Sequence, residues 1–228
     1  MTIPSRHGPS DPGGEPPKRG ISSGVGRAAV SARSRAMRIA LAHDLIRAGR
    51  VLERRGMIAA AQGNLSARVS PERMLITRAG RRKGELTTRD FVEIVLASGE
   101  DTPDSREVSK EHRVHRAGYA ARGEAESILH AHPVALTAFA IRGRAPDFSR
   151  FDEGRIVVGA AALVPYHVSG TQALADAVRR ALETAERPQL LLLENHGAVS
   201  LGRTVDEALS RLETAEHLAA ILLAAERG

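Results

Sequence analysis

The sequence contains no cysteine, and aromatic residues make up only 3% of its 228 residues. Without cysteine the chain can form no disulfide framework and no thiolate metal site, so any metal must be held by nitrogen and oxygen atoms. The scarcity of aromatic side chains argues against a surface that stacks nucleic acid bases. No apolar run approaches the ~20 residues of a membrane helix, and the start of the chain lacks the hydrophobic core of a signal peptide. We therefore expect a cytoplasmic protein.

Acidic residues are scarce in the N-terminal segment, which carries most of the net charge. The formal charge of the chain is +6, and residues 1–38 contain seven Lys and Arg residues against Asp11 and Glu15. The rest of the chain is nearly neutral, which argues against nucleic acid as a partner. Residues 1–34 are rich in Gly, Pro, Ser and Arg and have little to bury. We expect a disordered basic leader there and one folded domain over residues 35–228.

Hydrophobic periodicity divides the folded part into helices and strands. Apolar residues recur at spacings of three and four from Met37 to about Gly56, which predicts a helix. Further helices are predicted over residues 110–122, 133–141, 171–186 and 204–227. Strands are predicted over residues 57–61, 67–70, 74–78, 92–97, 127–132 and 189–194. Interspersed helices and strands favour a single α/β domain in which helices are layered on a sheet.

Two histidines are found in the predicted strand at 127–132, although an apolar core has no use for imidazoles at that density. Residues i and i+2 of a strand point to the same face, so His130 and His132 project together. Pro133 then turns the chain, which places His132 at the end of the strand. Such a pair is a good chelate for zinc or a similar divalent ion. Two polar side chains on a solvated sheet face would have the same spacing.

Two further segments carry side chains of the same chemistry. Glu111 and His115 are four residues apart and share a helix face, although a glutamate at that position also complements the helix dipole. His196 follows the apolar run at 189–194 and precedes Gly197, where the backbone turns at the end of the sheet. A lone histidine in such a turn is more often structural than a ligand. The order of all these residues along the chain is nevertheless specific.

This order of Glu111, His130-x-His132 and His196-Gly197 resembles the class II aldolase/adducin family. The resemblance covers about residues 37–225 and includes several short motifs. The motifs are Gly63-Asn64-Leu65-Ser66, Leu75 to Gly80, Ser109-Lys110-Glu111 with His115 and Tyr119, His130 to Pro133, Tyr166 to Leu174, and Glu216-His217.

The resemblance implies a fold, a metal site and an assembly. The implied fold is a three-layer α/β/α sandwich around a mostly antiparallel sheet, commonly assembled as a homotetramer. The implied ligands of Zn²⁺, or of another divalent ion, are His130, His132 and His196, with Glu111 as fourth ligand or as catalytic acid and base. The residues implied to hold the phosphate of a substrate are Gly63, Asn64, Gly80, Ser109 and Lys110.

The implied function is that of a metal-dependent aldolase. Such an enzyme cleaves a ketose phosphate, like fuculose or ribulose 1-phosphate, to dihydroxyacetone phosphate and an aldehyde through a metal-stabilised enediolate. The sequence departs from the family pattern at Ala79 and Lys110, where hydroxyl side chains are usual. It also ends at Gly228, without the tail that supplies a catalytic tyrosine in fuculose-phosphate aldolases.

These departures keep two other functions open. One is a sugar-phosphate epimerase or a dehydratase like that acting on methylthioribulose phosphate, with Glu153 as a catalytic acid and base. The other is a non-catalytic, adducin-like module that binds partners. Such modules tend to lose the metal ligands, which this chain retains.

Overall fold

The computed structural model describes residues 23–97 and 107–226 and contains one seven-stranded sheet. The strands are β1 (Asn64–Ser70), β2 (Arg73–Thr77), β3 (Phe91–Val95), β4 (Ser127–Ala131), β5 (Ala161–Val164), β6 (Leu190–Leu193) and β7 (Gly197–Gly202). Their order in the sheet is β3-β2-β1-β4-β7-β6-β5. Neighbouring strands are antiparallel except for β5 and β6, which are parallel. The expectation of a mostly antiparallel sheet is therefore confirmed.

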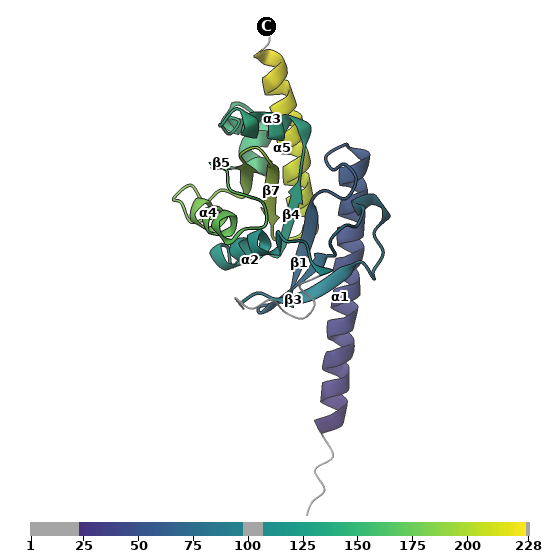
Figure 1. Cartoon of the computed structure of the whole chain (residues 1–228). Coiled ribbons are helices and arrows are strands. Elements are labelled where there is room, and N and C mark those ends of the chain that lie inside the picture. Colours follow the sequence, from purple (N-terminus) through teal and green to yellow (C-terminus); the bar gives the residue numbers. More distant parts are fainter. Residues whose placement is uncertain (1–22, 98–106, 227–228) are drawn as a thin grey trace, which may run out of the picture.

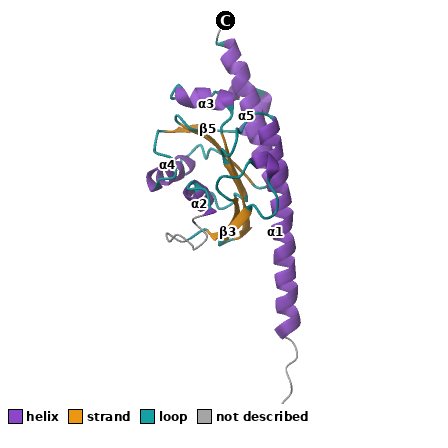
Figure 2. Cartoon of the chain, turned by 45° about the vertical axis from the view of Figure 1, so that its right-hand side comes forward, coloured by secondary structure: helices purple, strands orange, loops and turns teal. Residues whose placement is uncertain are grey.

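Helices cover both faces of the sheet. The helices are α1 (Ser23–Arg54), α2 (His112–Ala121), α3 (Val134–Ile141), α4 (Gln172–Leu182) and α5 (Val205–Ala225). Helices α1, α3 and α5 lie on one face, and α2 and α4 lie on the other (Figures 1 and 2). The architecture is the three-layer α/β/α sandwich expected from the sequence. No helix in the described part of the chain combines the length and the apolar character needed to cross a membrane.

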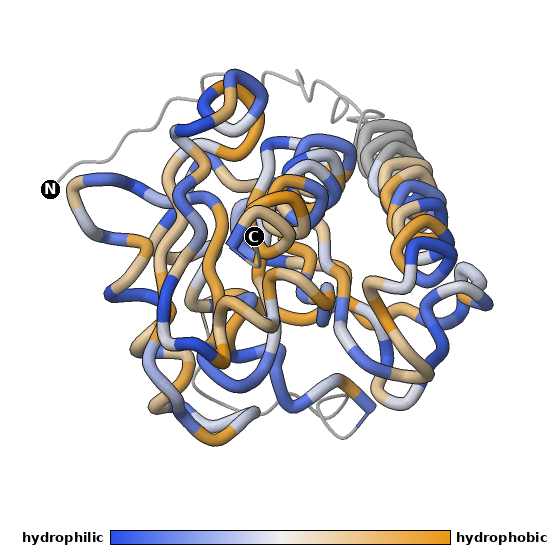
Figure 3. The backbone as a smooth tube through the Cα atoms, turned by 90° about the horizontal axis from the view of Figure 1, so that it is seen from above, coloured by the Kyte–Doolittle hydropathy of each residue, from blue (hydrophilic) through white to orange (hydrophobic). Residues whose placement is uncertain are grey.

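The core is divided into two layers because successive residues of a strand point to opposite faces. In β6, Leu190 and Leu192 pack in the layer under α1, α3 and α5, whereas Leu191 and Leu193 pack in the layer under α2 and α4. The continuous leucine run is thus explained by burial on both sides. Hydrophilic and hydrophobic residues alternate along the two long helices, α1 and α5, as expected for helices with one buried side (Figure 3).

The first helix begins earlier than the sequence pattern predicts. Helix α1 starts at Ser23 and therefore includes residues 23–34, for which we expected disorder. This segment is rich in alanine and arginine, both of which have high helix propensity. Residues 1–22 of the expected leader lie outside the described residues.

One predicted strand is not formed, and two observed strands were not predicted. Residues 57–61 form a loop rather than a strand, because Gly56, Ala60 and Gly63 all have positive φ angles that bend the chain. Strands β5 and β7 were not predicted, since each is short and is defined by pairing with distant strands. Strand β1 also begins three residues earlier than predicted, which brings Asn64 and Ser66 into the sheet.

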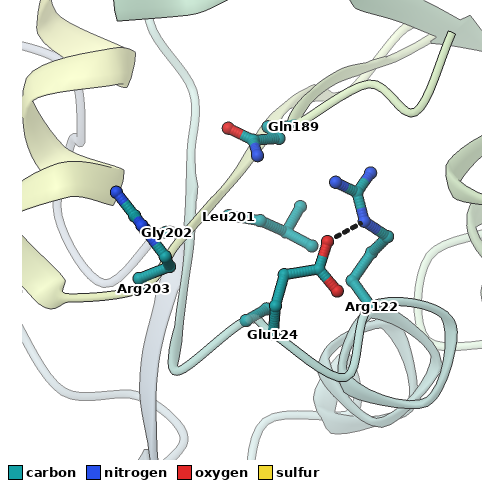
Figure 4. Close-up of a pocket in the computed structure, with 7 residues that line it drawn as sticks. Arg122, Glu124, Gln189, Leu201, Gly202 and Arg203 are labelled. Carbon is teal, nitrogen blue, oxygen red and sulfur yellow. Dashed lines mark hydrogen bonds and ion pairs between the residues drawn. The ribbon is translucent and has the colours of Figure 1, made fainter.

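At the end of the sheet where β4 begins, two arginines form hydrogen bonds between separate segments of the chain. The Arg122 guanidinium donates to the carbonyl of Pro188 (2.8 Å) and to a carboxylate oxygen of Glu124 (2.8 Å). Arg187 donates to the same carboxylate oxygen of Glu124. Figure 4 shows Arg122 and Glu124 close to the end of β7. The cluster described next lies at the opposite end of β4.

Candidate active site

His130 is held in the sheet with one ring nitrogen engaged. It lies in β4, paired with Asn64 of β1 and Val199 of β7, and its side chain is 1% exposed. Its Nδ1 donates to the carbonyl oxygen of Ala198 at 2.9 Å. Because Nδ1 is the donor in this bond, Nε2 is the ring nitrogen that can bind a metal at the end of the strand.

His132 and His196 meet His130 because of two tight backbone contacts. The backbone N–H of His132 donates to the carbonyl of Met57, at the start of the loop that was predicted to be a strand. A Cβ atom on Gly197 would lie 2.5 Å from the Ala131 carbonyl oxygen and 2.8 Å from a carbon of the His132 ring. Only glycine therefore lets the turn between β6 and β7 approach His132 closely enough to bring His196 beside it.

The three imidazoles converge as metal ligands do. Their ring centroids are 4.8–5.0 Å apart, and one ligand atom from each lies within 4.8 Å of the others. Burial and the other two imidazoles lower the pKa of His132 to about 4, which keeps that ring neutral. Three imidazoles at the end of a sheet, each able to offer one ring nitrogen, fit a divalent ion such as zinc, with a further position open.

Glu111 completes the cluster expected from the sequence. Its two carboxylate oxygens lie 3.1 Å from Nε2 of His130 and 3.1 Å from Nε2 of His196. Burial favours the neutral acid, but His130 and His196 outweigh it and hold the pKa of Glu111 well below its ordinary value. An ionised carboxylate at this position can bind a metal or accept a proton.

Two side chains hold the Glu111 carboxylate in place. The amide nitrogen of Asn64 donates to one oxygen (2.7 Å), and the hydroxyl of Ser169 donates to the other (2.7 Å). Ser169 reaches the site because a Cβ on Gly170 would lie 2.7 Å from the Cβ of Lys110, so the loop packs directly on the turn before α2. Ser169 lies in one of the motifs of the sequence, but nothing in its spacing from Glu111 predicts this hydrogen bond.

A buried hydrogen-bonded chain extends behind Asn64. His115 Nε2 donates to the Asn64 side-chain oxygen (2.5 Å), and the Ser66 hydroxyl lies 2.6 Å from His115 Nδ1 and 2.9 Å from the Tyr119 hydroxyl. Burial lowers the pKa of His115 to about 3, so the ring is neutral and Nδ1 accepts from Ser66. His115 thus acts on Glu111 through Asn64 and orients its amide, rather than touching the carboxylate itself.

A cavity of about 330 Å³ opens in front of these residues. It is within the size range of small-molecule sites. The residues that line it and that were expected from the sequence are Gly63, Asn64, Gly80, Ser109, Lys110, Glu111, His132 and His196. Its lining also includes Lys83, which belongs to the run of basic residues after Gly80, and Ser169, for which the sequence predicted no role.

The expected phosphate-binding residues have individual structural reasons for their positions. Gly63 has φ +71°, and a Cβ there would lie 2.5 Å from the His130 carbonyl oxygen, so only glycine lets β1 begin beside His130. The Ser109 hydroxyl accepts from the Asn64 amide and from the backbone N–H of Glu111. Lys110 is exposed at the rim. Helix α2 begins at His112 rather than at Lys110, so the turn at 109–111 presents its side chains to the cavity.

The structure does not bring Glu153 to this cluster within one chain. Glu153 lies just before a π-helical turn (Gly154–Val158). It lines a different cavity together with Arg55, which follows α1, and with Glu213 and His217 of α5. The sequence spacing after His132 therefore does not place its carboxylate beside the metal ligands of the same chain.

Glu216 on α5 caps the helix that follows His132, and this leads to a prediction. Its carboxylate accepts hydrogen bonds from the backbone N–H groups of Ala135 (2.8 Å) and Leu136 (2.9 Å). The N-cap residue is Pro133, whose side chain has no atom that could accept these bonds. Replacing Glu216 with Ala is expected to lower the free energy of unfolding by about 1–2 kcal/mol. It should also weaken Zn²⁺ binding about 10-fold, since His132 directly precedes the capped turn. Denaturant unfolding of the metal-free protein and a competition titration with Zn²⁺ measure the two effects.

Glu213→Ala is the matched control for Glu216. Glu213 lies on the same helix and pairs with the exposed Arg55 at 2.8 Å. Removing a surface pair of this kind should change stability by less than about 1 kcal/mol and leave Zn²⁺ affinity unchanged. Unaltered Zn²⁺ affinity in Glu216→Ala would show that the cap does not position His132.

Comparison with known proteins relates this site to a family. The profile of the family described as "Class II Aldolase and Adducin N-terminal domain" matches residues 43–223. A methylthioribulose-1-phosphate dehydratase of Methylococcus capsulatus is 31% identical over 201 residues, covering 78% of this chain and 90% of that protein. A 5-methylthioribulose-1-phosphate/5-deoxyribulose-1-phosphate aldolase of Escherichia coli is 29% identical, covering 75% of this chain and 78% of that protein.

A solved structure agrees with these relatives. The crystal structure of L-fuculose-1-phosphate aldolase from Thermus thermophilus matches with a TM-score of 0.69 and 30% sequence identity. The match covers 82% of this chain and 94% of that protein. Fold and sequence thus point to the same group of proteins.

Proposed function

Because the chain belongs to the class II aldolase and adducin family, we propose that it is a metal-dependent lyase that dehydrates a ketose 1-phosphate of the methylthioribulose type. The relatives support this reading more than the aldolase reading that the sequence motifs favoured. Several relatives with 30–31% identity are named methylthioribulose-1-phosphate dehydratases. The expectation of an aldolase is therefore correct only at the level of the family. For this chain the relatives favour the dehydratase alternative over the aldolase.

The observation that carries the proposal is the convergence of Glu111 with His130, His132 and His196 at the cavity. These histidines would hold Zn²⁺ or a similar ion. When bound, such an ion supplies a Lewis acid that polarises the carbonyl of a ketose and favours loss of a proton from the neighbouring carbon.

Glu111 is the group that moves protons in the proposed reaction. Its ionised carboxylate accepts the proton from C3, next to the C2 carbonyl of the ketose phosphate, which leaves the substrate as an enediolate. The C4 hydroxyl then departs, and the proton held by Glu111 returns to it, so that one water is released. The remaining enol becomes a ketone, giving a 2,3-diketone phosphate. Asn64 and Ser169 keep the carboxylate oriented in both steps.

Aldol cleavage is the second candidate function. It is favoured by the relative from Escherichia coli, whose name describes an aldolase acting on 5-methylthioribulose 1-phosphate. The same carboxylate would then accept the proton of the C4 hydroxyl while the C3–C4 bond breaks, and would return it to C3 of the resulting enediolate to give dihydroxyacetone phosphate. The substrate class is shared, and only the bond that breaks differs.

The test is a product analysis with 5-methylthioribulose 1-phosphate and Zn²⁺-loaded protein. Dehydration yields one product that lacks one water and has an intact carbon chain. Aldol cleavage yields dihydroxyacetone phosphate and an aldehyde. Recovery of unchanged substrate from fully metal-loaded protein would reject both reactions on this substrate.

Several expectations from the sequence stay predictions. They are the identity of the ion as zinc, the homotetrameric assembly, the cytoplasmic location and the catalytic role of Glu153. A Glu153→Gln variant tests the last of these, because loss of turnover would require the residue to reach a site on another copy of the chain. The expectation of a non-catalytic adducin-like module has no support from relatives that are named as enzymes.

A further inference from the structure

Lys83 is a buried cation at the cavity that the proposed reaction does not use. It lies in a short 3₁₀ turn (Lys83–Glu85), and its side chain is 1% exposed. It nevertheless lines the same cavity as Glu111 and His132. A buried lysine is unfavourable unless it has partners or a function.

Three parts of the chain fix the position of Lys83. Its Nζ donates to the carbonyl oxygens of Ala61 (2.9 Å) and Arg81 (2.7 Å), which belong to the two loops that carry Gly63 and Gly80. Its own carbonyl packs against α1, since a Cβ on Gly49 would lie 2.3 Å from that oxygen. The ammonium group is therefore placed as precisely as a functional group requires.

The ammonium has bonding capacity left over. A lysine has three N–H donors, and within the described residues the third finds no acceptor. The Ala61 and Arg81 carbonyls, which would otherwise repel an anion, are turned toward Nζ. Burial lowers the pKa of Lys83 to about 8, while the facing carboxylates of Glu111 and Glu53 oppose this effect. The group therefore carries its charge at neutral pH.

The other cations of the cavity are placed differently. Arg78 pairs with Glu107, and Lys110 is exposed at the rim. Among the Lys and Arg residues that line the cavity in the described part of the chain, Lys83 alone is buried. We infer that Lys83 binds the phosphate group of the substrate, with its free N–H directed between the two loops. This inference rests on the proposed function in one respect, namely that the substrate carries a phosphate.

The test measures binding of inorganic phosphate to the Zn²⁺-loaded protein by the rise in unfolding temperature that phosphate produces. Each variant is compared with its own phosphate-free sample, so a folding defect cancels. Lys83→Met is expected to bind phosphate at least about 10-fold more weakly, as for the loss of a hydrogen bond from a charged donor. Arg82→Met, which removes the exposed neighbouring cation that does not line the cavity, should lose less than about 3-fold because solvent screens its charge.

The outcomes separate a binding role from a structural one. If Lys83 only ties the two loops together, Lys83→Met unfolds at a lower temperature but keeps the phosphate affinity of the natural protein, which overturns the inference. If Lys83→Met does not fold, Lys83→Gln replaces it, since its amide can still donate to the Ala61 or Arg81 carbonyl but carries no charge. Unchanged phosphate affinity in the folded Lys83→Gln protein, or no phosphate binding by the natural protein, also overturns the inference. Phosphate binding that depends on Lys83 without turnover of any sugar phosphate would reject the proposed function and leave this inference standing.

Discussion

Replacing His130 with Ala is expected to remove the metal and with it all measurable turnover. His130 is the most buried of the three imidazoles, and its Nδ1 bond to Ala198 aims Nε2 at the other two rings. Loss of a residue that only supports a ligand costs about 10–100-fold in metal affinity, so loss of a ligand should cost at least 100-fold. Metal content after dialysis against a weak chelator, measured by elemental analysis, checks the result.

Two controls accompany His130→Ala. His43→Ala removes an exposed imidazole on α1 and should keep both metal and turnover. A strong chelator applied to the natural protein should abolish turnover, and added Zn²⁺ should restore it. Retention of one equivalent of metal by a folded His130→Ala protein would mean that the ion is held elsewhere.

Replacing Glu111 with Gln is expected to lower kcat by about 10²–10⁴-fold while the protein keeps its metal. The glutamine has the same shape but cannot accept a proton, and general acid and base groups contribute rate factors of about this size. One oxygen acceptor also becomes an NH₂ group facing the Asn64 amide or the Ser169 hydroxyl. The expected change is therefore mainly in kcat, with a smaller effect on stability. Steady-state kinetics with a metal-loaded variant measures it.

Glu124→Gln is the matched control for Glu111→Gln. Glu124 accepts from Arg122 and Arg187 at the other end of the sheet, so its replacement should leave kcat unchanged. If Glu111→Gln turned over substrate at the rate of the natural protein, another group would have to be the proton acceptor. A loss of metal from this variant would instead assign Glu111 mainly to the coordination of the ion.

Local sequence patterns predicted much of the frame of the site. The alternation of β4 put His130 and His132 on one side, and the structure brings their rings to 4.9 Å. Four helices were predicted within a few residues of their observed bounds, namely α2, α3, α4 and α5. Each has a continuous amphipathic or apolar pattern. The three histidines and Glu111 were recognised by their chemical types and their order along the chain.

The hydrogen bonds that hold Glu111 were not predicted, because the partners are far apart in the sequence; Asn64 itself was expected at the site, but as a phosphate-binding residue. Asn64 and Glu111 are 47 residues apart, and Ser169 and Glu111 are 58 apart. No periodicity relates such positions, so only the folded chain shows that they hydrogen-bond. Glu216 is a similar case, since it accepts from the backbone N–H of Ala135, which lies 81 residues earlier in the chain.

The sequence by itself determined the kind of site, which has nitrogen and oxygen ligands and a strand that presents paired histidines. Its motifs also suggested the family. Tertiary structure decided which side chains act together. It buried Lys83 against the cavity and left Glu153 on another face. The physical reason is that periodicity records which side of an element faces the core, whereas the contacts of a site depend on how separate elements pack and on where glycines such as Gly63 and Gly197 allow two backbones to approach.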